Sequence, residues 1–195
     1  MPRAAQFDHD DLLNAALRVI ATRGPAAVSI EAIAAEMGGN VGSIYHRFAS
    51  KDHLLAQLWL RCSERGQTGM VAALTGDDLD HALTVAVLHY PRWARTNLSE
   101  AQVLAAYGRE HLLPSWPAEL ASELETANKG LLDALATFAA RWYGDDHREH
   151  GQAVTFAVLD IPVAAIRRYL LNGRRPPRRL DAHIVAAARA ALCRG

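Results

Sequence analysis

The chain has 195 residues, of which 50% are apolar and 22% charged, and its 21 Lys and Arg residues balance its 21 Asp and Glu residues. This composition fits a packed globular protein of one or two domains and argues against a disordered chain. A formal charge of zero excludes a strongly basic nucleic-acid coat protein, so any DNA contact must come from a few placed groups.

Targeting, membrane and redox signals are missing from the sequence. The first residues lack the apolar stretch of a signal peptide, and no run of about eighteen uncharged apolar residues occurs. Cys62 and Cys193 form neither a metal-spaced pair nor a disulfide framework. We therefore expect a cytoplasmic protein without a membrane segment, a metal site or a cofactor.

Helical periodicity runs through nearly every segment, which predicts an all-α protein of about nine helices. Caps and glycine stops delimit four N-terminal helices: one between Asp8 and Gly24, one between Ser29 and Gly38, a short one from Asn40 through Tyr45, and one that begins after Ser50. Five more helices follow at about 78–95, 99–112, 116–143, 147–172 and 180–193. Pro91 and Pro162 fall inside two of them and should kink them.

The spacing of small and apolar residues in the second and third helices is typical of a helix-turn-helix. Ala34 allows close helix approach, Gly38 suits a left-handed turn, and Ile44 anchors the helix that follows. An ordinary helical hairpin has the same spacing, so this pattern alone leaves both interpretations open. The surface opposite Ile44 favours DNA, because it carries hydroxyls and cations that suit phosphate contacts.

The sequence resembles the TetR family of bacterial regulators over residues 8 to 58. The resemblance is carried by three segments: Val28-Ser29-Ile30-Glu31-Ala32-Ile33-Ala34-Ala35-Glu36-Met37-Gly38, Gly42-Ser43-Ile44-Tyr45-His46-Arg47-Phe48 and Ser50-Lys51-Asp52-His53-Leu54-Leu55. It implies a three-helix DNA-binding domain at residues 1–50 and a helical effector-binding and dimerisation domain at residues 51–195. It also implies a homodimeric regulator with no enzymatic activity, a repressor that a small organic effector releases from a palindromic operator.

Transferred position by position, the family's DNA contacts fall on eight residues: Ser29, Val41, Gly42, Ser43, Tyr45, His46, Arg47 and Lys51. Val41 departs from the family's polar or basic residue and would make an apolar contact, for example with a thymine methyl. Residues 1–51 carry five Arg and Lys residues against five acidic residues, so non-specific DNA affinity should be modest. Tyr45 could instead be a partly buried core residue.

The resemblance also assigns roles to the second domain. An organic, partly aromatic effector would be bound by aromatic side chains, of which we select five: Trp59, Trp93, Tyr107, Phe138 and Phe156. These residues could equally fill an ordinary core. The small-residue faces of helices 147–172 and 180–193 predict the dimer contact, which Arg at Ala164 or Ala188 should split.

The second domain also contains two polar segments, and the sequence allows two alternative functions. His147-Arg148-Glu149-His150 has metal-like residue types but sits at a helix start, and the Arg-rich loop 174–179 is a solvated loop or a second nucleic-acid contact. A helical enzyme is one rival, although no catalytic motif occurs. A helical adaptor that has lost DNA binding is the other, favoured by the neutral N-terminal domain and Val41.

Overall fold

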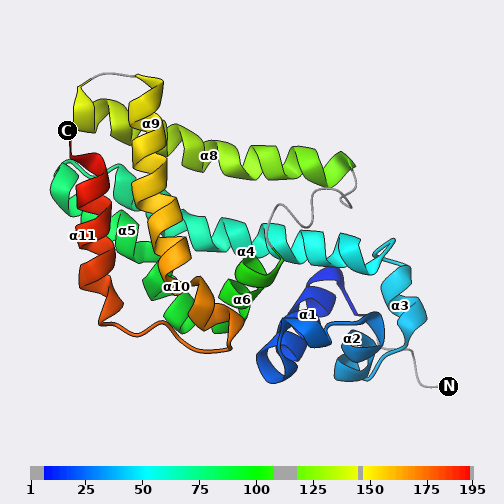
Figure 1. Ribbon diagram of the computed structural model, residues 1–195. Helices are drawn as coiled ribbons and strands as arrows, with labels where there is room; N and C mark the ends of the chain where they lie inside the picture. The colour runs from blue at the N-terminus through cyan, green and yellow to red at the C-terminus, as the bar shows by residue number, and fades with distance from the viewer. Residues whose placement is uncertain (1–6, 108–117, 145–146, 194–195) are drawn as a thin grey trace.

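The computed structural model describes residues 7–107, 118–144 and 147–193, and all regular structure in these ranges is helical (Figure 1). The first part of the chain forms α1 (His9–Arg23), the 3-10 turn η1 (Pro25–Ala27), α2 (Ile30–Met37), α3 (Val41–Tyr45) and α4 (Lys51–Leu74). The second part forms α5 (Leu79–Thr96), α6 (Leu98–Ala106), α8 (Ala118–Tyr143), α9 (Arg148–Thr155), the π-helical turn η3 (Phe156–Asp160), α10 (Ile161–Leu171) and α11 (Leu180–Leu192). With α9, η3 and α10 taken as one continuous path, the described residues form nine helices, which confirms the predicted all-α fold.

Local capping chemistry explains why the N-terminal helices begin where the sequence predicts. Asp8 forms a reciprocal capping box with Asp11, and Ser29, Asn40 and Ser50 each accept a hydrogen bond from the backbone N–H three residues on. Each cap satisfies an N–H group that the first helical turn leaves without a partner. The four caps therefore help to fix where α1, α2, α3 and α4 begin.

The helix predicted at 147–172 is interrupted where Pro162 lies. The turn Phe156–Asp160 is π-helical and ends two residues before the proline. Proline has no N–H to donate to the preceding turn, and a π-turn is one way in which a helix accommodates that loss. In contrast, α5 continues as one helix through Pro91. The residues 108–112 predicted to end the sixth helix lie outside the described residues.

Two large hydrophobic clusters meet at α4 and α6. The N-terminal cluster joins α1, α2 and α3 to the first half of α4, down to Leu58 and Cys62, and also includes Val103 of α6. The C-terminal cluster begins at Met70 on α4 and extends to Leu192 on α11. The N-terminal core therefore continues past residue 50, where we expected the first domain to end, and α4 spans both cores.

The helices of the second part lie along and across α4. Figure 1 shows α8 running beside α4, with the path α9–η3–α10 and α11 crossing at the end away from α1, α2 and α3. Among the described residues, no helix combines the length and apolarity that a membrane crossing requires.

Candidate functional site

The turn between α2 and α3 has the geometry that the sequence predicts for a helix-turn-helix. Gly38 adopts a left-handed conformation (φ 63°, ψ 24°), and the N–H of Gly39 donates to the carbonyl of Ala34 over 3.0 Å. Ile44 and Phe48 are fully buried against α1 and α4, with 1% and 0% of their surface exposed. These two anchors fix the orientation of α3 and leave its opposite side in solvent.

The exposed side of α3 collects most of the proposed DNA-reading side chains. Tyr45 is 53% exposed and thus stands outside the core, while Gly42, His46 and Lys51 are also exposed. Arg47 is half-buried, and its guanidinium donates to the carbonyl of Ser43 over 3.3 Å. These five residues lie between α3 and the start of α4, and all but Arg47 are exposed.

Three of the predicted contact residues already have structural partners. Ser29 Oγ accepts the N–H of Ala32 at 3.1 Å, and Ser43 Oγ donates to Asn40 Oδ1 at 3.1 Å. Val41 is half-buried against the N-terminal cluster. Each could face DNA only with the part of its side chain that the fold leaves free. A Cβ at Gly42 would approach Asn40 Oδ1 to 3.2 Å, so a glycine here keeps the cap undisturbed.

Acidic groups temper the positive charge of this surface. Glu31 lies in the first turn of α2, where hydrogen bonds from its own backbone N–H and from Ser29 lower the pKa of its carboxyl. The carboxylate therefore stays ionised next to a candidate phosphate contact. Arg18 on α1 pairs with Glu36 on α2 at 2.9 Å, so its charge is partly neutralised. Both features agree with the weak non-specific DNA affinity expected from the charge balance.

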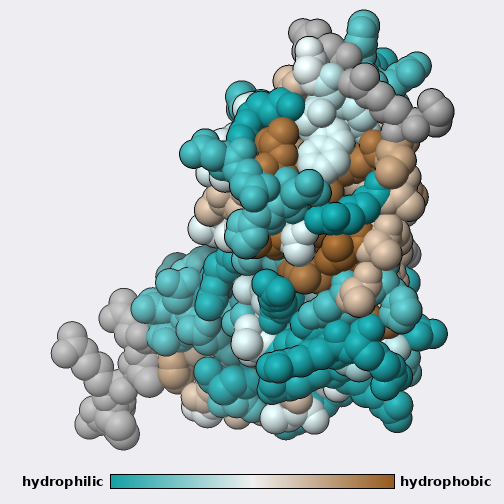
Figure 2. All heavy atoms as spheres, turned by 90° about the vertical axis from the view of Figure 1, so that its left-hand side faces the viewer, coloured by the Kyte–Doolittle hydropathy of each residue, from teal (hydrophilic) through white to brown (hydrophobic). Residues whose placement is uncertain are grey.

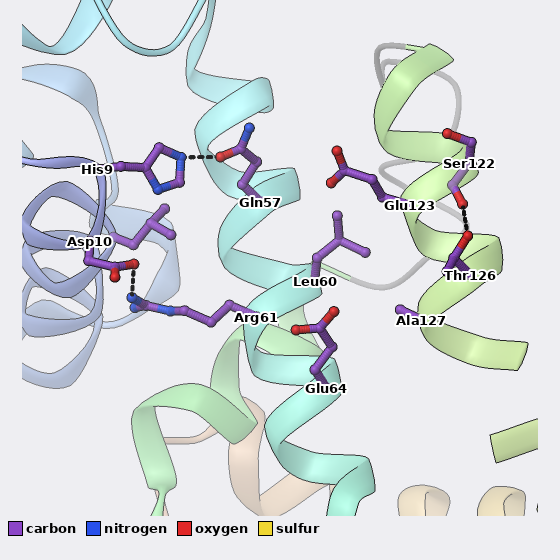
Figure 3. A pocket seen from close by; sticks show the side chains of 11 residues that line it. His9, Asp10, Gln57, Leu60, Arg61, Glu64, Ser122, Glu123, Thr126 and Ala127 are labelled. Atoms are coloured by element: carbon purple, nitrogen blue, oxygen red, sulfur yellow. Dashed lines mark hydrogen bonds and ion pairs between the residues drawn. The ribbon is translucent and has the colours of Figure 1, made fainter. Parts of the chain in front are cut away.

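A polar cleft lies between α1, α4 and α8 (Figure 3). His9 and Asp10 of α1 face Gln57 and Arg61 of α4, and Glu123 of α8 lies on the other side. The His9 ring hydrogen-bonds Gln57, and Arg61 pairs with Asp10 at 3.4 Å. These contacts attach α1 directly to the helix that enters the second domain.

A second, more apolar cavity of about 470 Å³ lies within the C-terminal part, in the size range of small-molecule sites. Its wall comes from α4, α5, α6, α8, α9, η3 and α10, and consists of Trp59, Ser63, Gly66, Gln67, Met70, Tyr90, Leu104, Asn128, Leu131, Leu132, Thr155, Leu159, Asp160 and Val163. Of the five aromatic residues that we selected from the sequence, this cavity takes in Trp59.

The other four selected aromatics lie elsewhere. Trp93 stacks on Tyr90 with ring centroids 5.8 Å apart, and Phe138 is fully buried and stacks on Trp142. The hydroxyl of Tyr107 donates to the carbonyl of Pro25 at 2.5 Å, which joins α6 to η1. Phe156 is 52% exposed. Sequence reasoning also missed the amides Gln67 and Asn128, which lie 61 residues apart and carry no motif.

The surface of α9, η3, α10 and α11 is partly apolar. Phe156, Val163 and Leu171 are exposed large hydrophobics, and Ala164 and Ala187 are exposed small ones. Figure 2 faces the side on which α11 lies, and it shows apolar surface gathered in the upper half above a hydrophilic lower half. Ala188, in contrast, is fully buried in the C-terminal core. Our choice of Ala188 as a dimer probe was therefore wrong, because Arg there would disrupt the subunit itself.

The structure bears on the two polar segments noted in the sequence, 147–150 and 174–179. Within the described ranges, no group of three or more His, Cys, Asp or Glu side chains is arranged to hold a metal ion. The arginines of loop 174–179 are exposed, and Arg95 fastens the loop by pairing with Asp181 and donating to the carbonyl of Pro176 at 2.8 Å.

Comparison with known proteins identifies a matching family and similar solved structures. The family described as bacterial regulatory proteins, tetR family, matches residues 12–58. A search of curated proteins gave no significant match. Among solved structures, a putative TetR-family transcription regulator from Shewanella sp. PV-4 is similar, with a TM-score of 0.67, 21% identity and 94% of this chain and 95% of that chain covered.

Two further structures share the fold at similar length. A TetR transcription regulator from Haloarcula marismortui has a TM-score of 0.69 at 15% identity, with 94% of this chain and 95% of that chain covered. The FadR regulator from Bacillus subtilis, solved with stearoyl-CoA, has a TM-score of 0.65 at 17% identity, with 95% and 96% covered. Residues 12–58 therefore match the DNA-binding domain of the tetR family of bacterial regulatory proteins, and the chain shares the fold of solved TetR-family transcriptional regulators along almost its whole length.

Proposed function

We propose that the protein is a homodimeric repressor that leaves a palindromic operator when a small organic molecule enters the cavity beside α4. The observation that carries the proposal is the exposed face of α3, fixed by Ile44 and Phe48, on a chain whose second part contains an apolar cavity. On this proposal residues 1–50 read DNA, and residues 51–195 bind the effector and the second subunit.

The DNA contacts divide by chemistry and exposure. Tyr45 and Lys51 are exposed at the edge of the face and suit phosphates, whereas His46 and Arg47 suit base edges in the major groove. We expect Lys51→Ala to weaken binding to all sequences and to reduce the salt slope by about one unit. We expect Arg47→Ala to cost about 1–3 kcal/mol on the selected site and less on random DNA, if Arg47 binds guanine with both guanidinium nitrogens.

The test is a selection from random duplexes, followed by affinity measurements at several salt concentrations for wild type, Tyr45→Ala, Arg47→Ala and Lys51→Ala. Arg148→Ala, an exposed arginine at the start of α9, is the matched control and should leave DNA affinity unchanged. Selection of an inverted repeat supports the proposal. A wild type that selects no sequence would contradict it and would favour the adaptor that has lost DNA binding.

The dimer proposal rests on the exposed apolar side chains of η3, α10 and α11. Two-fold pairing of such a face would present two α3 helices to successive half-sites. Ala164→Arg and Ala187→Arg place a charge on this face without entering the core, and both should shift the dimer toward monomer. Ala72→Arg, on an exposed face of α4, is the control. Light scattering that shows a wild-type monomer at micromolar concentration would refute the proposal.

A further inference from the structure

The effector cavity is poor in charge. Among the described residues that line it, Asp160 alone carries a formal charge, and it is exposed on η3. Eight of the other lining residues are aliphatic, aromatic or thioether side chains: Trp59, Met70, Tyr90, Leu104, Leu131, Leu132, Leu159 and Val163. A carboxylate or phosphate placed here would lose its hydration, gain no cation from these residues and face a like charge.

The polar character of the cavity comes mainly from one pair of amides. Gln67 Nε2 donates to Asn128 Oδ1 at 3.0 Å and to Ser63 Oγ at 2.8 Å. Both hydrogens on that nitrogen are thereby engaged, while Gln67 Oε1 can still accept and Asn128 Nδ2 can still donate. If both amides are turned over together, Asn128 Nδ2 donates to Gln67 Oε1, and the pair still presents a free donor and a free acceptor and no charge.

A cationic group lies in a neighbouring pocket. Arg148 lines a separate cavity of about 500 Å³ between α8 and α9. Leu132, Thr155 and Asp160 line both cavities and so form the boundary between them. An anionic ligand would have to reach past this boundary to meet Arg148, and it would pass Asp160 on the way.

We propose that the cavity selects a neutral amphiphile, with an apolar body against the lining hydrophobics and one uncharged donor–acceptor group, such as an alcohol, hydrogen-bonded to Gln67 and Asn128. This inference rests on the proposed function of the second domain as the effector domain. It separates this chain from the similar FadR regulator of Bacillus subtilis, which was solved with the anionic stearoyl-CoA.

Three probes with the same chain and different heads test the selection. Decan-1-ol, decanoate and decyltrimethylammonium are titrated into the full-length protein below their micelle concentrations, with tryptophan fluorescence as one readout and calorimetry as the other. Trp59 lines the cavity and so reports occupancy. We expect decan-1-ol to bind at least about tenfold more tightly than either ion, because one buried hydrogen bond or one unpaired buried charge is worth that factor or more.

Leucine variants of Gln67 and Asn128 test whether these two amides recognise the hydroxyl of decan-1-ol. Gln67→Leu and Asn128→Leu keep the approximate volume, remove the hydrogen bonds and should reduce decan-1-ol affinity about tenfold with little effect on the ions. Gln152→Leu is the matched control, since Gln152 lines the neighbouring pocket and should not affect decan-1-ol. Circular dichroism melting checks that each variant folds, and the two amide variants remove the pair from different helices.

The outcomes distinguish this inference from the proposed function, because operator affinity is measured with each probe. Tighter binding of decan-1-ol that is lost in Gln67→Leu or Asn128→Leu supports the inference, whether or not it releases DNA. Tighter binding of decanoate, lost in Arg148→Gln, would overturn the inference and leave the repressor proposal intact. Tighter binding of decyltrimethylammonium, lost in Asp160→Asn, would overturn it in favour of a cationic effector, as would binding of decan-1-ol that neither leucine variant weakens.

Discussion

Two glycines in the interiors of long helices form a matched pair for testing how closely α4 and α5 approach. Gly130 on α8 has no neighbouring atom within 4 Å of where a Cβ would lie, so Gly130→Ala should raise the free energy of unfolding by about 0.5–1 kcal/mol. At Gly69 on α4 the same Cβ would collide with the imidazole of His89, whose Nδ1 would be only 2.7 Å away. The His89 ring cannot withdraw freely, because its Nε2 is hydrogen-bonded to the carbonyl of Gly66 at 3.0 Å.

The net change in the free energy of unfolding for Gly69→Ala is the gain from replacing a helical glycine minus the cost of overpacking against His89. Overpacking a core contact costs about 1–3 kcal/mol, so Gly69→Ala should lower the unfolding free energy by up to about 2.5 kcal/mol, whereas Gly130→Ala raises it. Urea denaturation followed by circular dichroism measures both variants. A double-mutant cycle with His89→Ala isolates the contact, since alanine at residue 69 should become favourable once the ring is gone. The reasoning is refuted if Gly69→Ala destabilises equally in both backgrounds.

Three more predictions follow from single contacts. Burial lowers the pKa of His89 from 6.5, against the opposing effect of the Gly66 carbonyl. The unfolded chain therefore binds the proton more readily, and the unfolding free energy should fall as the pH drops from about 6.5 toward the folded pKa. Denaturation at pH 7.5 and 5.5 should show a smaller fall in His89→Leu than in wild type. Arg95→Ala removes the charged hydrogen bonds that fasten loop 174–179 to α5 and should lower the unfolding free energy by about 1.5–3 kcal/mol, which a urea titration would reveal. Ile44→Ala should cost about 2–5 kcal/mol and reduce operator affinity, as measured by denaturation and anisotropy, because Ile44 fixes α3 to the core.

Local chemistry made the N-terminal helices predictable. A serine or asparagine cap acts within three residues, and the left-handed turn at Gly38 needs no information from the rest of the fold. The exposed position of Tyr45 follows similarly from the position of Ile44 on a short helix. Helical period was enough in these cases because one face of each helix meets a single core.

Helical periodicity alone did not predict which faces of the C-terminal helices are buried. Ala164 and Ala188 both lie on small-residue faces of the sequence, yet Ala164 is exposed and Ala188 is fully buried. The difference depends on which helix covers which face, and that is a long-range property. The cavity could not be predicted from the sequence for the same reason, since Gln67 and Asn128 become partners only when α4 and α8 lie side by side.

Leu104 lies between the proposed effector cavity and the N-terminal cluster, and it is the subject of the last prediction. Its side chain lines the cavity and packs against both hydrophobic clusters, while its neighbour Val103 is buried in the N-terminal cluster. A ligand can shift DNA affinity only if it binds two arrangements of the domains unequally, and a packed side chain between them is a physical means of doing so. Leu104→Ala should therefore weaken the coupling, so that ligand binding changes operator affinity by a smaller factor than in wild type. Operator affinity is measured with and without saturating ligand, and Leu132→Ala, which alters an exposed part of the cavity wall, is the control. Coupling that is unchanged in Leu104→Ala would show that the signal reaches the DNA-binding domain along α4 without this contact.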